Sequence, residues 1–177
     1  MTWLIAEDEA DIRNLLAMMC QVWGYKALTF ENGQRAWDWL DTVEQGQQSD
    51  LPELILMDIR MPGKKGNEVA QRMRTIAPLQ KTPIVLMTAF SLSERERSDM
   101  MSEDGVDRII SKPLPDFEEL RTILTDVIQQ KKNQAQPLNL HPSENDAHDE
   151  PNPVPQRQSE PQPKADASLD KPATPPG

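Results

Sequence analysis

The stretch LILMDIRMPG, residues 54–63, decides the fold class of this chain, because a uniformly apolar run ends in a carboxylate and a Pro/Gly turn. Four apolar residues in a row between turn signals are typical of a strand that is buried on both faces. In open α/β folds, ligands bind at the carboxyl edge of such strands. We therefore expect Asp58, which follows the apolar run, to lie at a ligand-binding edge of a sheet.

Short apolar runs and amphipathic stretches alternate on both sides of residues 54–63, from residue 1 to about residue 130. This alternation is the pattern of repeated βα units, which form a parallel sheet covered by helices on both faces. The predicted strands are residues 3–6, 25–30, 54–57, 84–87 and 108–111. The predicted helices are residues 11–23, 34–45, 67–76 and about 94–101, with a last one from about residue 117. The pattern does not give the order of the strands in space.

The first predicted helix carries apolar side chains at helical spacing. We expect the following residues to form the face that lies against the sheet: Ile12, Leu15, Leu16, Met19 and Val22. Cys20 lies beside them and is expected to pack in the core, since no second cysteine or nearby histidine accompanies it. Ser93 with Glu96, and Asp116 with Glu119, have the spacing of N-caps for two later helices.

The composition argues against several classes of protein. A formal net charge of -10 with a pI near 4.7 argues against nucleic-acid binding, because no large basic cluster offsets it. The single cysteine allows no intrachain disulfide, so nothing requires an oxidising compartment. The N-terminus has neither a basic signal-peptide region nor an apolar stretch long enough to span a membrane. We expect a cytoplasmic protein that does not bind membranes.

The character of the chain changes near residue 130. Ten of the sixteen prolines lie between residues 133 and 177, where there is no aromatic residue and apolar residues are few. Such a segment cannot bury enough apolar surface to offset the entropy of ordering it. The sequence therefore predicts one folded domain, residues 1–130, followed by a Pro-rich, acidic and disordered tail, residues 131–177.

Polar residues follow four of the predicted strands at the point where each strand ends: the pair Glu7-Asp8, then Asp58, Thr88 and Lys112. Because the carboxyl ends of parallel strands share one edge, we expect these residues to converge. Three carboxylates in one pocket need a countercharge, and a ligand set made only of oxygen suits Mg²⁺ or Mn²⁺. An aspartate in this company can act as a nucleophile toward phosphorus, while lysine and threonine hold the phosphoryl oxygens.

Taken singly, each of these residues is more often a helix cap, an ordinary strand residue or a solvated lysine than part of a site. Together, the Glu-Asp pair, Asp-x-x-Met-Pro, Thr-Ala and Lys-Pro occur in the order found in receiver domains of two-component response regulators, which residues 1–130 resemble. The resemblance implies a doubly wound, flavodoxin-like α/β fold with strand order 2-1-3-4-5 and five helices, as in single-domain receivers of the chemotaxis type.

The same resemblance implies a role for each residue. Asp58 would accept a phosphoryl group from a histidine kinase or a histidine phosphotransfer protein. The Mg²⁺ ligands would be Asp8, Asp58, Glu7 through water, and the backbone carbonyl of Arg60. The phosphoryl group would be bound by Thr88 and by Lys112, the latter followed by a cis peptide bond to Pro113.

Residue 109 departs from the common receiver pattern, and two variable positions beside the pocket carry bulky side chains. Many receivers carry Tyr or Phe three residues before the lysine, where rotation of the ring couples phosphorylation to the output surface. Here that residue is Ile109, so we expect a different readout. Arg60 and Phe90 stand two residues after Asp58 and Thr88, and we expect their bulk to cover the phosphoryl group and slow its hydrolysis.

We expect a stand-alone receiver that is a regulatory phosphoacceptor rather than an enzyme, supports its own phosphorylation and slow self-dephosphorylation, and signals to an effector protein. Family analogy allows a homodimer through the fourth and fifth helices, although nothing in the sequence selects it. One alternative is a constitutive interaction module whose Pro-rich tail docks a partner independently of phosphorylation. Another is a Mg²⁺ phosphohydrolase, but Arg60 occupies the obvious place for the general acid that it would need.

Overall fold

The computed structural model of the chain describes residues 1–135. Its strands are β1 (Thr2–Ala6), β2 (Lys26–Phe30), β3 (Leu54–Asp58), β4 (Ile84–Thr88) and β5 (Arg108–Ser111). Its helices are α1 (Ala10–Val22), α2 (Gly33–Glu44), α3 (Gly66–Thr75), α4 (Glu94–Ser102) and α5 (Phe117–Ala135), with a short 3₁₀ helix, η1 (Ala77–Leu79). The strands form one parallel sheet in the order β2-β1-β3-β4-β5, which confirms the expected fold.

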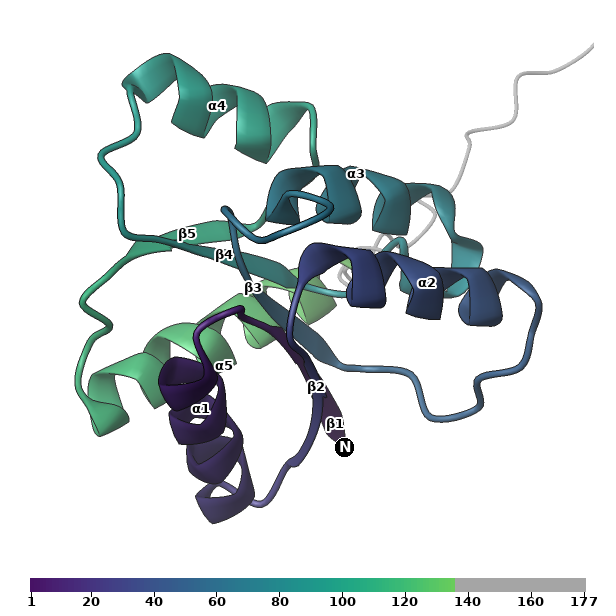
Figure 1. Cartoon of the computed structure of the whole chain (residues 1–177), viewed down its shortest axis with the longest axis horizontal. Helices are drawn as coiled ribbons and strands as arrows, with labels where there is room; N and C mark the ends of the chain where they lie inside the picture. The colour runs from purple at the N-terminus through teal and green to yellow at the C-terminus, as the bar shows by residue number, and fades with distance from the viewer. Residues whose placement is uncertain (136–177) are drawn as a thin grey trace, which may run out of the picture. The chain divides into compact units, whose positions relative to one another are not determined.

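Helices cover both faces of this sheet (Figure 1). Helices α1 and α5 lie on one face, and α2, α3 and α4 lie on the other. Successive side chains of a strand point to opposite faces, so Leu56 belongs to the core under α1 and α5 while Met57 belongs to the core under the other helices. This double burial explains why β3 and β4 are apolar at nearly every position.

The register of the sheet brings the strand ends to one edge. Asp58, the last residue of β3, pairs with Met87 in β4, and Thr88 pairs with Ser111 in β5. On the other side of β3, Met57 pairs with Ala6, the last residue of β1. The residues that follow these pairs therefore leave the sheet at the same edge, although they are far apart in the sequence.

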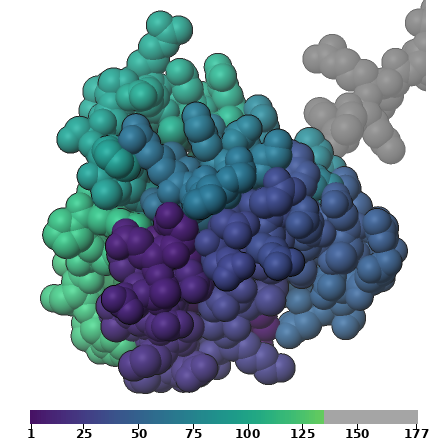
Figure 2. All heavy atoms as spheres, in the orientation of Figure 1, coloured from purple at the N-terminus to yellow at the C-terminus, as the bar shows by residue number. Residues whose placement is uncertain are grey.

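The prediction of which α1 side chains lie against the sheet is partly wrong. Leu16 and Cys20 are buried, but Leu15 is 48% exposed and Val22 is 74% exposed. Apolar side chains surround most of α1, so their spacing does not reveal which of them is centred on the sheet. The structure centres the contact on Leu16 and Cys20, which leaves an exposed apolar stripe on α1. Helix α1 belongs to the purple part of the surface in Figure 2.

The predicted N-caps are present. The Ser93 hydroxyl accepts a hydrogen bond from the Glu96 N–H at 3.2 Å, and the Glu96 carboxylate accepts one from the Ser93 N–H at 2.9 Å. The Asp116 carboxylate accepts a hydrogen bond from the Glu119 N–H at 2.9 Å. Each side chain satisfies a backbone donor that the first turn of a helix leaves free. The start of α4 is thus fixed by local contacts.

Helix α5 continues past residue 130 and is described as far as Ala135. The disorder and the docking function predicted for the tail concern residues that, from 136 onward, lie outside the described part of the chain. Within residues 1–135, no helix combines the length and the apolar character that crossing a membrane requires.

Candidate functional site

Three carboxylates meet at the carboxyl edge of the sheet. Glu7 and Asp8 follow β1 directly, and Asp58 ends β3. One oxygen from each of the three carboxylates lies within 4.8 Å of the others. Glu7 is fully buried, Asp58 is 8% exposed and Asp8 faces solvent. The cluster therefore has a buried base and one open side.

Lys112 places a positive charge against the buried side of this cluster. Its Nζ donates a hydrogen bond to Glu7 Oε1 at 3.0 Å and lies 3.5 Å from Asp58 Oδ2. The Lys112 backbone N–H donates to the carbonyl of Thr88 at 2.7 Å, which fixes the lysine beside the end of β4. The peptide bond from Lys112 to Pro113 is cis. One ammonium group thus lies against two of the three clustered carboxylates, those of Glu7 and Asp58.

Burial dominates the electrostatics of the cluster. It raises the pKa of Glu7; the ion pair with Lys112 opposes this shift only in part, and the nearby charge of Asp58 adds to it. Burial likewise raises the pKa of Asp58 despite its attraction to Lys112. For Lys112 burial disfavours the charge, but the hydrogen bond to Glu7 and the charge of Asp58 outweigh it, so the pKa is raised. The pocket is short of positive charge.

The donors of this pocket fit a hard divalent cation. Both oxygens of the buried Glu7 carboxylate lie against Lys112 Nζ, Oε1 at 3.0 Å and Oε2 at 2.9 Å. All three donors are carboxylates, and Mg²⁺ and Mn²⁺ prefer oxygen ligands. A cation beside Asp8 on the open side would supply the charge that Lys112 alone does not.

Thr88 and Phe90 lie at the end of β4, the strand next to the one that Asp58 ends. Thr88 is 1% exposed, and its Oγ1 accepts a hydrogen bond from the Phe90 N–H at 3.1 Å. The Phe90 ring, 49% exposed, lies under the guanidinium of Arg60, whose Cζ is 3.6 Å from the ring centroid. Ile109 is buried in the core under α2, α3 and α4. Metal binding by the Arg60 carbonyl stays a prediction.

Two glycines hold the loop that follows Asp58. Gly63 has a φ of +82°, a conformation that residues with a side chain rarely adopt. At Gly66, a Cβ would lie 2.3 Å from the backbone oxygen of Asp58. The loop can therefore pass directly behind Asp58 only because residue 66 has no side chain. Gly66 was not singled out in the sequence, where it reads as one of two glycines in a turn.

Arg13 holds the loop that carries the other two acids, and sequence reasoning missed it. Its Nη1 donates hydrogen bonds to the backbone carbonyls of Glu7 at 2.6 Å and Asp8 at 3.2 Å. These contacts fix the first turn after β1, so that both carboxylates are presented at the sheet edge. The sequence signal that could have identified Arg13 is a basic residue within two helical turns of the pair Glu7-Asp8.

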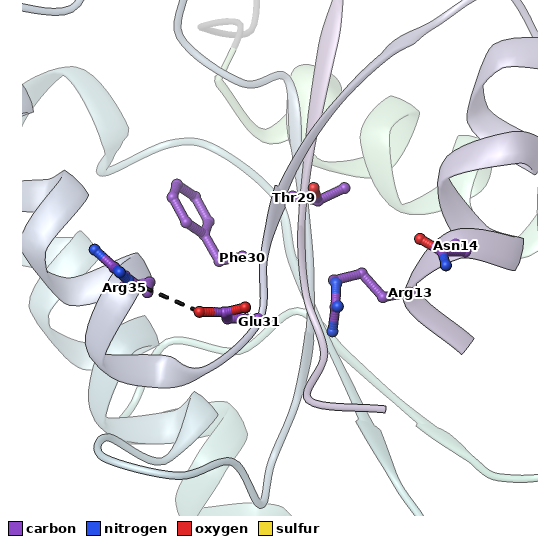
Figure 3. Close-up of a pocket in the computed structure, with 6 residues that line it drawn as sticks. All are labelled: Arg13, Asn14, Thr29, Phe30, Glu31 and Arg35. Atoms are coloured by element: carbon purple, nitrogen blue, oxygen red, sulfur yellow. Dashed lines mark ion pairs between the residues drawn. The ribbon is translucent and has the colours of Figure 1, made fainter. Parts of the chain in front are cut away.

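An open, polar hollow lies on the far side of Arg13 (Figure 3). It is lined by Arg13, Asn14, Thr29, Phe30, Glu31 and Arg35. Glu31 and Arg35 form an exposed ion pair of 3.9 Å on one side of it, opposite Arg13 and Asn14. None of the three clustered carboxylates lines this hollow, so it is separate from the site.

A second hollow, of about 280 Å³, borders the site on the side of α1. It is lined by Ile12, Leu15 and Met19 of α1 and by the segment 112–115. Leu15 also belongs to the exposed apolar stripe of α1, together with Met18, 61% exposed, and Val22. Lys112, although mostly buried, thus lines a hollow that is otherwise apolar and lies next to this stripe.

Comparisons with known proteins agree with this geometry. Residues 3–125 match the family model described as the response regulator receiver domain. The chain is 35% identical over 112 residues to the phosphate regulon transcriptional regulatory protein PhoB of Pseudomonas aeruginosa, an alignment that covers 63% of this chain and 45% of PhoB. It spans less than two thirds of several such relatives, among them 52% of the response regulator Rre1 of Synechocystis.

Other relatives are shorter. The sporulation initiation phosphotransferase F of Bacillus subtilis is 30% identical over 130 residues, which cover 73% of this chain and 95% of that protein. Among solved structures, the chemotaxis response regulator CheY4 of Vibrio cholerae has a TM-score of 0.58 at 23% identity, covering 71% of this chain and 97% of the other.

A receiver domain of a sensor histidine kinase from Pseudomonas aeruginosa has the same TM-score of 0.58 at 23% identity, over 72% of this chain and 97% of that one. That structure is described as having a magnesium ion coordinated in its active site cleft. At such identities the two structures show the fold alone, whereas the family model covers most of the described residues. The chain therefore belongs to the response regulator receiver domain family of two-component systems.

Proposed function

We propose that the chain accepts a phosphoryl group on Asp58 from a phosphohistidine of a histidine kinase or a histidine phosphotransfer protein, in a reaction that depends on Mg²⁺. The observation that carries this proposal is the position of the Asp58 carboxylate, which shares one pocket with two further carboxylates and the Lys112 ammonium group. Phosphoryl transfer depends chiefly on such positioning and on neutralising charge. Mn²⁺ prefers the same oxygen ligands and is expected to substitute.

Each residue has a definite part in this reaction. An oxygen of Asp58 forms a bond to phosphorus while the bond from phosphorus to the donor imidazole nitrogen breaks. The electron pair of the broken bond stays on that nitrogen, which takes up a proton. Lys112 and Thr88 bind the phosphoryl oxygens, for which Thr88 exchanges its weak contact with the Phe90 carbonyl, at 3.4 Å. Bound Mg²⁺, held by Glu7, Asp8, Asp58 and the Arg60 carbonyl, would neutralise charge on the phosphoryl group.

The product is a signal rather than a released compound, so the protein is a regulatory phosphoacceptor. A phosphoryl group adds roughly -1.5 to -2 charge, by analogy with other phosphoresidues, and this charge biases the contacts of the protein with an effector. We include in the proposal a slow self-dephosphorylation, residues 1–130 as the signalling unit, and a cytoplasmic location, where such kinases present their phosphohistidines. A homodimer through α4 and α5 belongs to the same proposal.

The apolar surface of α1 is suited to binding the phosphoryl donor. The donor must bring an imidazole ring to Asp58, so its contact surface has to border the pocket. Leu15, Met18 and Val22 form an exposed apolar stripe, and the hollow beside Leu15 includes Lys112. Exposed apolar patches of this kind mark contact surfaces between proteins. The stripe supports a protein donor rather than a small molecule.

Phosphoryl transfer from two donors tests the proposal. Wild type should accept phosphoryl groups from phosphoramidate and from a phosphorylated histidine phosphotransfer protein, and EDTA should abolish both reactions. Leu15→Asp should slow transfer from the protein by roughly tenfold or more, because a buried charge disrupts an apolar contact, and should leave the small donor unaffected within about twofold. Rates are measured by separating the phosphorylated and unphosphorylated forms.

Met101→Asp is the matched control, since Met101 is a similarly exposed apolar residue, 45% exposed, on α4. It should change neither rate. Equal losses with both donors in Leu15→Asp would mean that the substitution damages the pocket, and full activity with both would contradict the docking surface. If neither donor phosphorylates wild type in Mg²⁺, the proposed function is wrong.

A further inference from the structure

Arg60 and Phe90 join the two loops on either side of the acidic pocket. Arg60 follows β3 and Phe90 follows β4, and the guanidinium lies 3.6 Å from the centroid of the Phe90 ring. Phe90 is 49% exposed, so the core does not hold its ring in this position. An exposed cation–π contact is a weak interaction, and it is weaker than a charge-assisted hydrogen bond between arginine and a phosphoryl group.

The same ring is tied to Thr88. The Phe90 N–H donates to Thr88 Oγ1 at 3.1 Å, and the Thr88 hydroxyl has a long contact of 3.4 Å with the Phe90 carbonyl. When Thr88 turns its hydroxyl toward a phosphoryl oxygen on Asp58, this long contact is lost. The backbone of Phe90 is then held less firmly, while the stack with Arg60 still opposes movement of its side chain.

Helix α4, which follows this loop, is packed only weakly against the rest of the domain. None of its residues, Glu94–Ser102, is buried. The positive charge of Arg60 also acts on Glu96 in the first turn of α4, where it adds to the hydrogen bonds from Ser93 in lowering the pKa of Glu96. Phe90, on which Arg60 stacks, lies four residues before the start of α4, so a change in the partner of Arg60 acts on the loop that leads into this helix.

Residue 109 offers no aromatic ring for this purpose, because Ile109 is aliphatic and buried in the core. Phe90 is thus the aromatic residue that a rearrangement of Thr88 would displace. The guanidinium of Arg60, two residues after Asp58, would be within reach of both the Phe90 ring and a phosphoryl group on Asp58. Because the phosphoryl group binds a guanidinium more strongly than the ring does, Arg60 should bind the phosphoryl group.

We propose that Arg60 is a phosphoryl-binding residue held in reserve on the Phe90 ring: phosphorylation of Asp58 draws the guanidinium onto the phosphoryl oxygens, frees Phe90 and loosens the loop ahead of α4. This inference rests on the proposed phosphorylation of Asp58. It predicts that Arg60, and not Phe90, protects the phosphoryl group from water. A passive cover formed by the stacked pair would depend on both residues equally.

The ring can be followed by ¹⁹F NMR after the phenylalanines are replaced by 4-fluorophenylalanine. The chain has three phenylalanines, so three signals are expected, and Phe90→Leu identifies the one from residue 90. With excess phosphoramidate and Mg²⁺, the Phe90 signal of wild type should shift while the other two stay in place. In Arg60→Gln, the Phe90 signal should already lie near its shifted position before the donor is added.

Decay of the phosphorylated protein separates the two accounts. After removal of the donor, Arg60→Gln should lose its phosphoryl group at least about fivefold faster than wild type, and Arg60→Lys should fall between the two. Phe90→Leu should decay within about twofold of wild type, since Arg60 is still available. A Phe90→Leu protein that decays as fast as Arg60→Gln would support a passive cover and overturn the proposal.

Intact mass is recorded on the same samples. A wild-type protein that gains no phosphoryl group would overturn the proposed function, and this inference with it. A wild-type protein that gains the group while the Phe90 signal does not move would overturn only the role of Arg60. If Arg60→Gln loses its phosphoryl group at the wild-type rate, the role of Arg60 alone is likewise overturned.

Discussion

Replacing Lys112 with alanine should lower the free energy of unfolding by about 3 kcal/mol at about pH 7.5, because removal of one partner of a buried ion pair leaves the other charge uncompensated. The partner is Glu7, which is fully buried, and the Lys112 side chain is itself only 9% exposed. Asp58 loses the same countercharge. Urea unfolding in the presence of EDTA measures this change.

The loss should depend on pH, and its sign follows from the pKa of Glu7. That pKa is already raised above its ordinary value of 4.5, and without Lys112 it rises further. A carboxyl group of this kind is neutral in the folded protein at low pH, so the penalty is small below about pH 4.5 and grows as the pH rises through the folded-state pKa. We therefore expect a much smaller loss at about pH 5 than at about pH 7.5.

Two variants act as controls for this prediction. Adding Glu7→Gln to Lys112→Ala should recover much of the stability, since the amide cannot carry the uncompensated charge. Lys131→Ala breaks a more exposed ion pair, in which the side chain of Lys131 is 23% exposed and that of Asp107 is 18% exposed. This substitution should lower the free energy of unfolding by about 1 kcal/mol or less. An equal loss for Lys112→Ala at both pH values would contradict the electrostatic description of the pocket.

Replacing Asp58 with asparagine should abolish phosphoryl acceptance and, at the same time, stabilise the metal-free protein. The pKa of Asp58 is raised, chiefly by burial, so its charged form opposes folding near neutral pH. Asparagine has nearly the same shape without the charge. We expect Tm in EDTA to rise by roughly 3–5 °C, as is typical when a buried, poorly compensated charge is removed from a domain of this size.

Mg²⁺ should reverse the order of the two Tm values, so that wild type melts above Asp58→Asn. A ligand that binds only the folded state raises Tm, so Mg²⁺ should stabilise wild type but have little effect on Asp58→Asn. Asp126→Asn, on the exposed side of α5, is the matched control and should leave Tm unchanged in both conditions. An Asp58→Asn protein that melts below wild type in EDTA would show that the charge of Asp58 contributes to stability.

The sheet and its functional edge could be predicted from the sequence because they follow from local patterns. Residues 54–57 and 84–87 are apolar without interruption, and they form most of β3 and β4. Since carboxyl ends of parallel strands share an edge, the residues after them had to meet. The structure accordingly brings Glu7, Asp8, Asp58 and Lys112 together.

The contacts that position these residues could not be predicted, because they join side chains to backbone atoms across the fold. Arg13 binds the carbonyls of Glu7 and Asp8, and Gly66 makes room for the carbonyl of Asp58. The sequence identified Arg60 and Phe90 as bulky neighbours of the pocket, but not that they stack on each other. The α1 face was misjudged for a related reason, since apolar spacing alone does not distinguish a core contact from an exposed apolar stripe.

Peptide mapping of the phosphorylated protein tests the central claim most directly. The chain is incubated with a small acyl-phosphate donor in Mg²⁺, its intact mass is measured, and the modified residue is located after rapid proteolysis at low pH. The account predicts a gain of one phosphoryl group on Asp58, and no gain in EDTA or in Asp58→Asn. A phosphoryl group located on any other residue, or an undiminished gain in Asp58→Asn, would contradict it.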